Sequence, residues 1–213
     1  MTDGPTRQAP LMPRWRLIAL ALYPVLVYVS LYLGRPELRS LCLPLLALLF
    51  LPLLPGMVGR TILMGAALAL AGLALFAPSL ALWPPGVIFV GLGIWFACTL
   101  RAGTTPVIER FANLVHANNG TAAPDHAGRW LRGWTLAWAI VLAAIGGVAL
   151  WLAADDRAQA WLLWVVIAAP LLMLATLWLE LLLRRRVFPE DDHPGLIRFL
   201  LDVVRIQPHH FAR

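Results

Sequence analysis

The sequence contains no lysine, and only 13% of its 213 residues are charged. Soluble domains have about 25% charged and about 45–50% apolar residues, whereas 61% of this chain is apolar. A chain of this length cannot bury so much apolar surface in one water-soluble core. The scarcity of charge therefore excludes a soluble globular domain and predicts that the lipid bilayer surrounds most of the chain.

The basic residues are all arginines, and 17 of them against 11 acidic residues give a net charge of +6. They are distributed between apolar segments rather than along one basic face, so we expect no nucleic-acid partner. Cysteine is also scarce. Cys42 and Cys98 lie in separate apolar segments, without the spacing of a metal site, a redox motif or a disulfide framework. We therefore expect no metal and no cofactor, and we interpret both cysteines as small core residues.

Long segments without charge predict the membrane spans. The longest, Thr61–Leu100, has 40 residues, and a single helix of that length would be about 60 Å long, twice the hydrocarbon thickness of about 30 Å. We expect it to form two helices joined by a turn at Pro78, Ser79 and Trp83–Gly86. The predicted fold is all-α: a polytopic six-helix bundle in one transmembrane domain, 1–213, with spans at about 17–34, 40–57, 61–77, 82–100, 133–154 and 160–182.

The arginines also predict how the spans are oriented. With the N-terminus inside, 14 of the 17 arginines lie on the cytoplasmic side. The outer side keeps Arg35, Arg39 and Arg157, each close to an acidic residue at Glu37 or Asp156. Because positive charge accumulates in cytoplasmic loops, we predict that both termini are cytoplasmic, together with a loop over 101–132 and a tail over 184–213.

Short amphipathic helices are predicted on the cytoplasmic side. In the loop, Thr105 is expected to cap a helix that begins at Pro106 and ends at Asn118. At about eleven residues this helix is too short to cross a bilayer, so we expect it to lie along the membrane surface. A second such helix is predicted over 196–205 in the tail.

Small residues in the apolar segments predict close packing between helices, because they let two backbones approach. They are Gly65, Ala69, Gly72, Gly91, Gly93, Gly146 and Gly147. Prolines inside the predicted spans can kink a helix or expose a carbonyl group, and we interpret Pro24, Pro44, Pro52 and Pro170 as ordinary membrane-helix prolines.

Four charged residues near the predicted cytoplasmic helix ends form the candidate functional site, a polar patch made of Arg101, Glu109, Arg132 and Glu180. Glu180 interrupts an apolar segment four residues before Arg184. Two roles are open for Glu180, and a structural ion pair with Arg184 is favoured over a proton relay because the residue lies near the membrane interface.

Motifs for catalysis are missing. The sequence has no HExxH motif, no glycine-rich phosphate loop and no serine nucleophile elbow, so we predict no catalytic residue. Glu109 and His116 are about 10.5 Å apart along a helix axis, too far for one proton transfer, which favours an ordinary solvated helix face.

The second half of the chain resembles a known family. The segments are FACTLRAGTTPVIERFANLVH from Phe96, RWLRGWTLAW from Arg129 and LELLLRRRVFP from Leu179. They are similar to small multi-pass inner-membrane proteins of bacterial aryl polyene and xanthomonadin-type pigment biosynthesis clusters, sometimes labelled ketosynthase. The positions that match the family's pattern are Leu100, Arg101, Gly103, Pro106, Ile108, Arg132, Thr135, Trp138, Glu180, Arg186, Phe188 and Pro189. The family's tyrosine position holds Trp130, which has no phenolic hydroxyl.

The resemblance implies a bacterial inner-membrane protein that assists acyl-chain or aryl polyene pigment biosynthesis, or the hand-over of its product. Soluble acyl-chain biosynthesis enzymes or an acyl carrier protein are the implied partners, beside the lipid bilayer. A ketosynthase is excluded, because condensing enzymes need a reactive cysteine with histidine partners on a soluble fold. We favour a non-catalytic accessory role, and the alternatives are a small transporter or flippase for a lipid-like product and a membrane-embedded acyltransferase.

Overall fold

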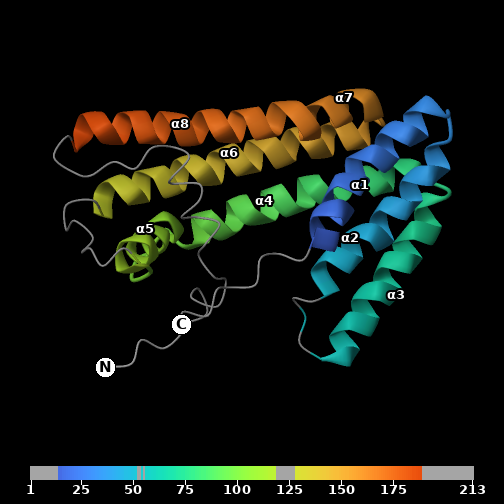
Figure 1. Cartoon of the computed structure of the whole chain (residues 1–213), viewed down its shortest axis with the longest axis horizontal. Coiled ribbons are helices and arrows are strands. Elements are labelled where there is room, and N and C mark those ends of the chain that lie inside the picture. Colours follow the sequence, from blue (N-terminus) through green and yellow to red (C-terminus); the bar gives the residue numbers. More distant parts are fainter. Residues whose placement is uncertain (1–13, 52–53, 55, 119–127, 189–213) are drawn as a thin grey trace. The chain divides into compact units, whose positions relative to one another are not determined.

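The computed structural model describes residues 14–51, 54, 56–118 and 128–188, and these residues form only helices, turns and bends (Figure 1). The predicted all-α fold class is confirmed for this part of the chain. The predicted tail helix over 196–205 lies outside the described residues.

Four helical stretches are long and apolar enough to cross a membrane. The first is α3 (Met57–Ala74), and the second is Pro78–Cys98, which joins the 3₁₀ segment η3 (Pro78–Leu82) to α4 (Trp83–Cys98). The third is α6 (Gly128–Ala154). The fourth is Ala158–Val187, built from α7 (Ala158–Leu163), a π-helical segment (Trp164–Ala168) and α8 (Ala169–Val187). These four correspond to the third to sixth predicted spans and support a membrane protein.

The first two predicted spans have shorter counterparts. Helix α1 (Arg14–Tyr32) has 19 residues. Its apolar part, Ala21–Tyr32, is shorter than the four stretches that can cross a membrane. The second predicted span, 40–57, contains α2 (Cys42–Phe50), which has nine residues and is about 13.5 Å long. It is preceded by the 3₁₀ segment η1 (Pro36–Leu41). Six spans therefore remain a prediction.

The turn within Thr61–Leu100 is placed differently from the prediction. Helix α3 ends at Ala74, and the chain turns over 75–77 before Pro78 begins η3. Pro84 and Pro85 lie in the first turn of α4 instead of in a turn between helices. The prediction was wrong for these two prolines, because the first turn of a helix has no intrahelical acceptor for its N–H groups and so tolerates proline.

The described chain divides into two compact units. Unit 1 contains Ile94–Ile140 and the described residues from Leu174 onwards; unit 2 contains the described residues up to Gly93 together with Val141–Met173. The boundaries fall inside α4, α6 and α8. The single transmembrane domain remains a prediction, and each unit is described separately below.

Unit 2 contains α1, α2 and α3 side by side (Figure 1). Its core is apolar, with Val27, Leu82 and Trp161 fully buried. Two side chains of α1 and α2 bind backbone carbonyl groups in this core: Tyr23 Oη donates to Ala81 at 2.5 Å, and Cys42 Sγ donates to Tyr23 at 3.7 Å. Cys42 is therefore a core residue, as predicted, whereas Cys98 is exposed.

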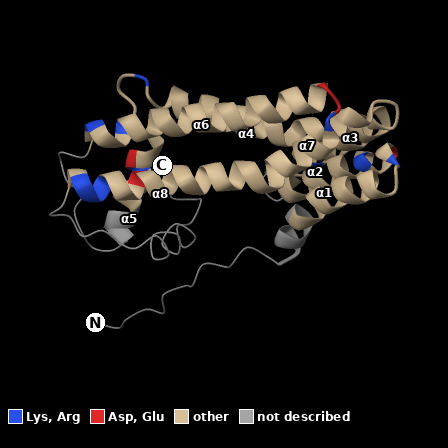
Figure 2. Cartoon of the chain, turned by 90° about the horizontal axis from the view of Figure 1, so that it is seen from above, with Lys and Arg blue, Asp and Glu red and all other residues tan. Residues whose placement is uncertain are grey.

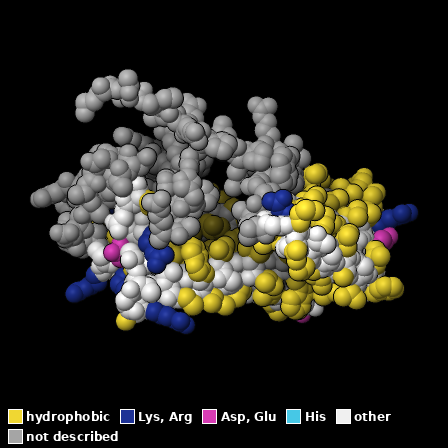
Figure 3. All heavy atoms as spheres, turned by 90° about the horizontal axis from the view of Figure 1, so that it is seen from below, with side chains coloured by type: hydrophobic (Ala, Val, Ile, Leu, Met, Phe, Trp, Pro, Cys, Tyr) yellow, Lys and Arg dark blue, Asp and Glu magenta, His cyan; other side chains and the backbone are white. Residues whose placement is uncertain are grey.

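The outer surface of the helices is strongly apolar. Only 11% of the α3 stretch is buried within the protein, and hydrophobic side chains cover much of the face shown in Figure 3. Water is a poor solvent for such a surface, so lipid contact on most sides of α3 follows from its composition.

A close contact in unit 2 joins α4 to α6 through two buried glycines, Gly86 and Gly146. A Cβ atom added to Gly146 would lie 2.6 Å from both the Gly86 carbonyl oxygen and the Val90 amide nitrogen. The predicted close packing is thus confirmed at Gly146. It is wrong at Gly65, Gly72, Gly91 and Gly147, where a Cβ atom would meet nothing within 4 Å.

Candidate functional site

The four residues of the predicted polar patch all lie in unit 1. Arg101 is exposed in the turn after α4, Glu109 is half-buried in the first turn of α5 (Val107–Asn118), Arg132 is half-buried on α6, and Glu180 is buried on α8. No hydrogen bond or ion pair between described residues joins any two of the four. They share one unit, but direct contacts do not assemble them into a single cluster.

Arg132 has a structural contact. Its Nη2 group donates a hydrogen bond to the carbonyl oxygen of Leu100, two residues beyond the end of α4. Carbonyl groups at a helix C-terminus have no intrahelical donor and carry partial negative charge. Arg132 therefore caps the end of α4 with a cation, which connects α6 to α4 within unit 1.

The start of α5 is fixed to the end of α4 by two threonines. Thr99 Oγ1 donates to the Phe96 carbonyl at 2.7 Å and accepts a hydrogen bond from the Val107 amide at 3.3 Å. Thr104 Oγ1 lies 2.8 Å from the carbonyl oxygens of both Thr99 and Arg101. The short predicted helix is confirmed, but its cap comes from Thr99 rather than from Thr105. Sequence spacing could not show this, because Thr99 is brought to α5 by a chain reversal.

Glu180 forms the predicted ion pair. Its Oε1 atom accepts a hydrogen bond from Arg184 Nη2 at 2.7 Å, and its Oε2 atom accepts one from Trp138 Nε1 at 3.3 Å. The Glu180 side chain is 5% exposed and that of Arg184 is 24% exposed. A buried carboxylate is stable only when its charge is paired and its lone pairs are satisfied, and these two donors meet that requirement.

Aromatic rings extend this contact between α6 and α8. Trp130 packs against Trp134 with ring centroids 5.9 Å apart, and against Phe188 at 5.8 Å. Trp130 and Trp138 are eight positions apart on α6, and Phe188, which directly follows α8, is eight positions after Glu180 on α8. The two contacts therefore share one antiparallel register. The buried Nε1 group of Trp130 has no hydrogen-bond partner among the described residues.

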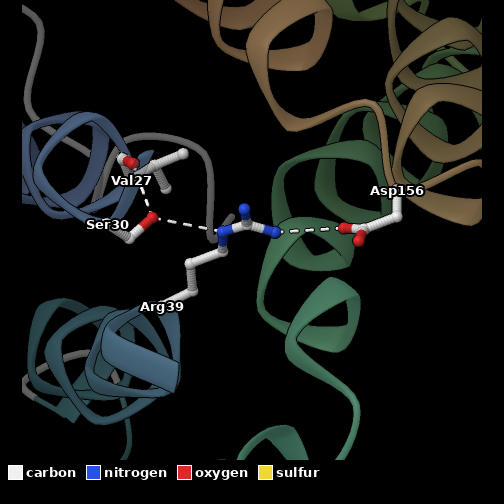
Figure 4. Close-up of polar contacts among 4 residues, drawn as sticks. All are labelled: Val27, Ser30, Arg39 and Asp156. Atoms are coloured by element: carbon white, nitrogen blue, oxygen red, sulfur yellow. Dashed lines mark hydrogen bonds and ion pairs between the residues drawn. The ribbon is translucent and has the colours of Figure 1, made fainter. Parts of the chain in front are cut away.

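A second buried charge, in unit 2, was missed by the sequence analysis. The Arg39 side chain, on η1, is 7% exposed; its Nε group donates to Ser30 Oγ at 3.1 Å and its Nη1 group donates to Asp156 Oδ1 at 3.0 Å (Figure 4). Ser30 Oγ in turn donates to the Val27 carbonyl at 2.7 Å. These bonds join α1, η1 and the turn between α6 and α7.

Two of the three arginines predicted on the outer side form ion pairs with other described residues. Arg39 binds Asp156 rather than nearby Glu37, and Arg157 binds Asp155 at 3.4 Å. Asp156 has a φ of 51°, the left-handed conformation that often ends a helix and that aspartate adopts more readily than most residues. No local signal predicts the Arg39 contact, because its two residues are 117 positions apart.

The described residues contain no group of three or more His, Cys, Asp or Glu side chains that could hold a metal ion. Glu109 and His116 both lie on α5, but the His116 side chain lies outside the described part, so the predicted separation of the two groups stays a prediction. Comparisons with protein-family models, with curated proteins and with solved structures gave no match.

Proposed function

We propose that this protein is an accessory protein of the bacterial inner membrane that docks soluble acyl-chain or pigment biosynthesis enzymes at the cytoplasmic surface, or assists hand-over of their lipid-like product. The observation that carries the proposal is the charge distribution of unit 1. Among its described residues, the exposed charged side chains are all arginines, whereas the two acidic ones are the buried, paired Glu180 and the half-buried Glu109. An acidic protein such as an acyl carrier protein complements such a surface.

The docking surface is placed on Arg101 and Arg110, at the α4–α5 turn and on α5. Both side chains are exposed. The hydrogen bonds of Thr99 and Thr104 hold the start of this segment against the end of α4. Docking onto a fixed helix costs less conformational entropy than docking onto a flexible loop. Two residues of the predicted patch, Arg101 and Glu109, lie in this segment. The other two, Arg132 and Glu180, stabilise the helices beside it through their hydrogen bonds.

Binding of purified acyl carrier protein to this protein in nanodiscs tests the docking surface. Wild type is expected to bind, and the double variant Arg101→Glu/Arg110→Glu is expected to lose at least tenfold in affinity, because two attractive charge contacts become repulsive. Arg157→Glu is the matched control, since Arg157 is an exposed arginine in unit 2. Absence of wild-type binding, or an equal loss in the control, contradicts the proposed docking surface.

The proposed topology has six spans with both termini in the cytoplasm. Alkaline phosphatase, which forms its disulfides only outside the cytoplasm, is expected to be active when fused after Gly34 or Asp156 and inactive when fused after Arg60 or Arg213. Activity measured in whole cells reports the side of each position. An inactive fusion after Gly34 beside an active one after Asp156 would mean that α1 and α2 do not cross the membrane.

A transporter for a lipid-like product is a second candidate, favoured by one observation. The π-helical segment Trp164–Ala168 lies immediately before α8, in which Pro170 has no N–H group to donate to Val166. π-Helical turns are frequent at functional sites. A transporter moves its cargo across the membrane without a soluble partner. Movement of a lipid-like cargo across vesicles that contain only the purified protein would therefore favour transport over docking.

A further inference from the structure

In unit 1, arginines lie at the N-terminal start of α6 and at the C-terminal end of α8, and they differ in their contacts. Arg184 is paired with Glu180, whereas Arg185, Arg186 and Arg129 are exposed and form no ion pair with another described residue. Arg129 is adjacent to Trp130, whose ring packs on Phe188, so the ends of the two helices lie together (Figure 2). Exposed arginines thus lie at the neighbouring ends of both helices.

The exposed sides of α6 and α8 near these arginines carry large apolar side chains. On α8, Leu182 and Trp178 lie three and seven positions before Arg185, on the same face of the helix. The exposed fractions are 49% for Leu136, 61% for Ile140, 57% for Trp178, 48% for Leu179 and 37% for Leu182. All five belong to unit 1. Tryptophan is enriched where the hydrocarbon meets the headgroups, so Trp130 and Trp134 place the arginines at headgroup level and the exposed leucines at the level of the acyl chains.

We propose that Arg185 and Arg186 bind the phosphate of an anionic phospholipid whose acyl chains lie on the exposed apolar face of α8. Arginine suits this ligand because its planar fork of N–H groups matches phosphate oxygens bidentately. A lipid is favoured over an acidic protein because the same surface continues into large exposed apolar side chains. This site is separate from the docking surface of Arg101 and Arg110 and does not depend on it.

Native mass spectrometry of the full chain, purified from vesicles of phosphatidylglycerol and phosphatidylcholine, tests the proposal. Wild type is expected to retain phosphatidylglycerol in preference to phosphatidylcholine. Each arginine near a charged headgroup contributes about fivefold to binding, so Arg185→Gln/Arg186→Gln is expected to reduce retained phosphatidylglycerol by roughly twenty-five-fold. The control is Arg157→Gln, which removes an exposed arginine of unit 2.

Two outcomes would overturn the lipid site. In the first, the double variant retains as much phosphatidylglycerol as wild type, or the control loses as much as the double variant. In the second, the double variant loses binding to acyl carrier protein while its lipid retention is unchanged, which would assign these arginines to a protein partner. Loss of lipid retention with normal binding of acyl carrier protein supports the proposal and leaves the docking function intact.

Discussion

Replacing Gly146 by alanine is expected to destabilise the protein by about 1–3 kcal/mol, the usual cost of inserting a methyl group into a closely packed contact. The new Cβ atom would lie 2.6 Å from the Gly86 carbonyl oxygen and from the Val90 amide nitrogen. Both are backbone atoms of α4, so no side-chain rotation relieves the clash and the helices must separate. Unfolding in detergent micelles, followed by tryptophan fluorescence against increasing SDS, measures the effect.

The neighbouring glycine provides a matched control. Gly147 is exposed, and a Cβ atom there meets nothing within 4 Å. Gly147→Ala is expected to be neutral or to stabilise the protein by up to about 1 kcal/mol, because alanine favours helix more than glycine does. Equal stability of the two variants would show that α4 and α6 do not depend on this close approach.

Removing Arg184 is expected to have the second large effect. In Arg184→Leu the Glu180 carboxylate, 5% exposed, keeps its Trp138 donor but loses its cation. Breaking a buried ion pair by removing one partner costs about 3 kcal/mol or more, because the remaining charge is left uncompensated in an apolar surrounding. The free energy of unfolding in neutral detergent, again measured with SDS, gives the cost directly.

The double variant Glu180→Leu/Arg184→Leu distinguishes a paired charge from a lost packing contact. With both charges replaced by apolar side chains, most of the stability is expected to return. Arg185→Leu serves as the neighbouring control and is expected to change stability by less than about 0.5 kcal/mol, since its side chain is exposed. A double variant as unstable as Arg184→Leu would contradict a role for the ion pair.

Local spacing was enough to predict the contacts made within one helix. Glu180 and Arg184 lie one helical turn apart, so the order of residues alone predicts their pairing. The short helix of the loop between α4 and α6 followed in the same way from its length and its alternation of polar and apolar residues. Its cap could not be predicted, because Thr99 directly follows the preceding helix and lies eight positions before Val107.

Contacts between distant segments depended on the tertiary structure. Gly146 and Gly147 are indistinguishable in the sequence, and only the position of α4 decides which of them tolerates a side chain. Likewise, Arg39 has an acidic neighbour at Glu37 but binds Asp156, because the turn after α6 brings that carboxylate to it. Arg132, a residue of the predicted patch, caps α4, and the sequence did not predict this contact between helices.

By itself, then, the sequence determined that this is an all-helical chain suited to a membrane, since transfer of apolar side chains out of water depends on composition and on run length. It also determined the pairs that one helix turn brings together. The tertiary structure alone decided which glycine carries the close helix contact, which carboxylate pairs with Arg39 and which charges support the fold. Those choices depend on the register between helices, and register is a property of packed surfaces rather than of local order.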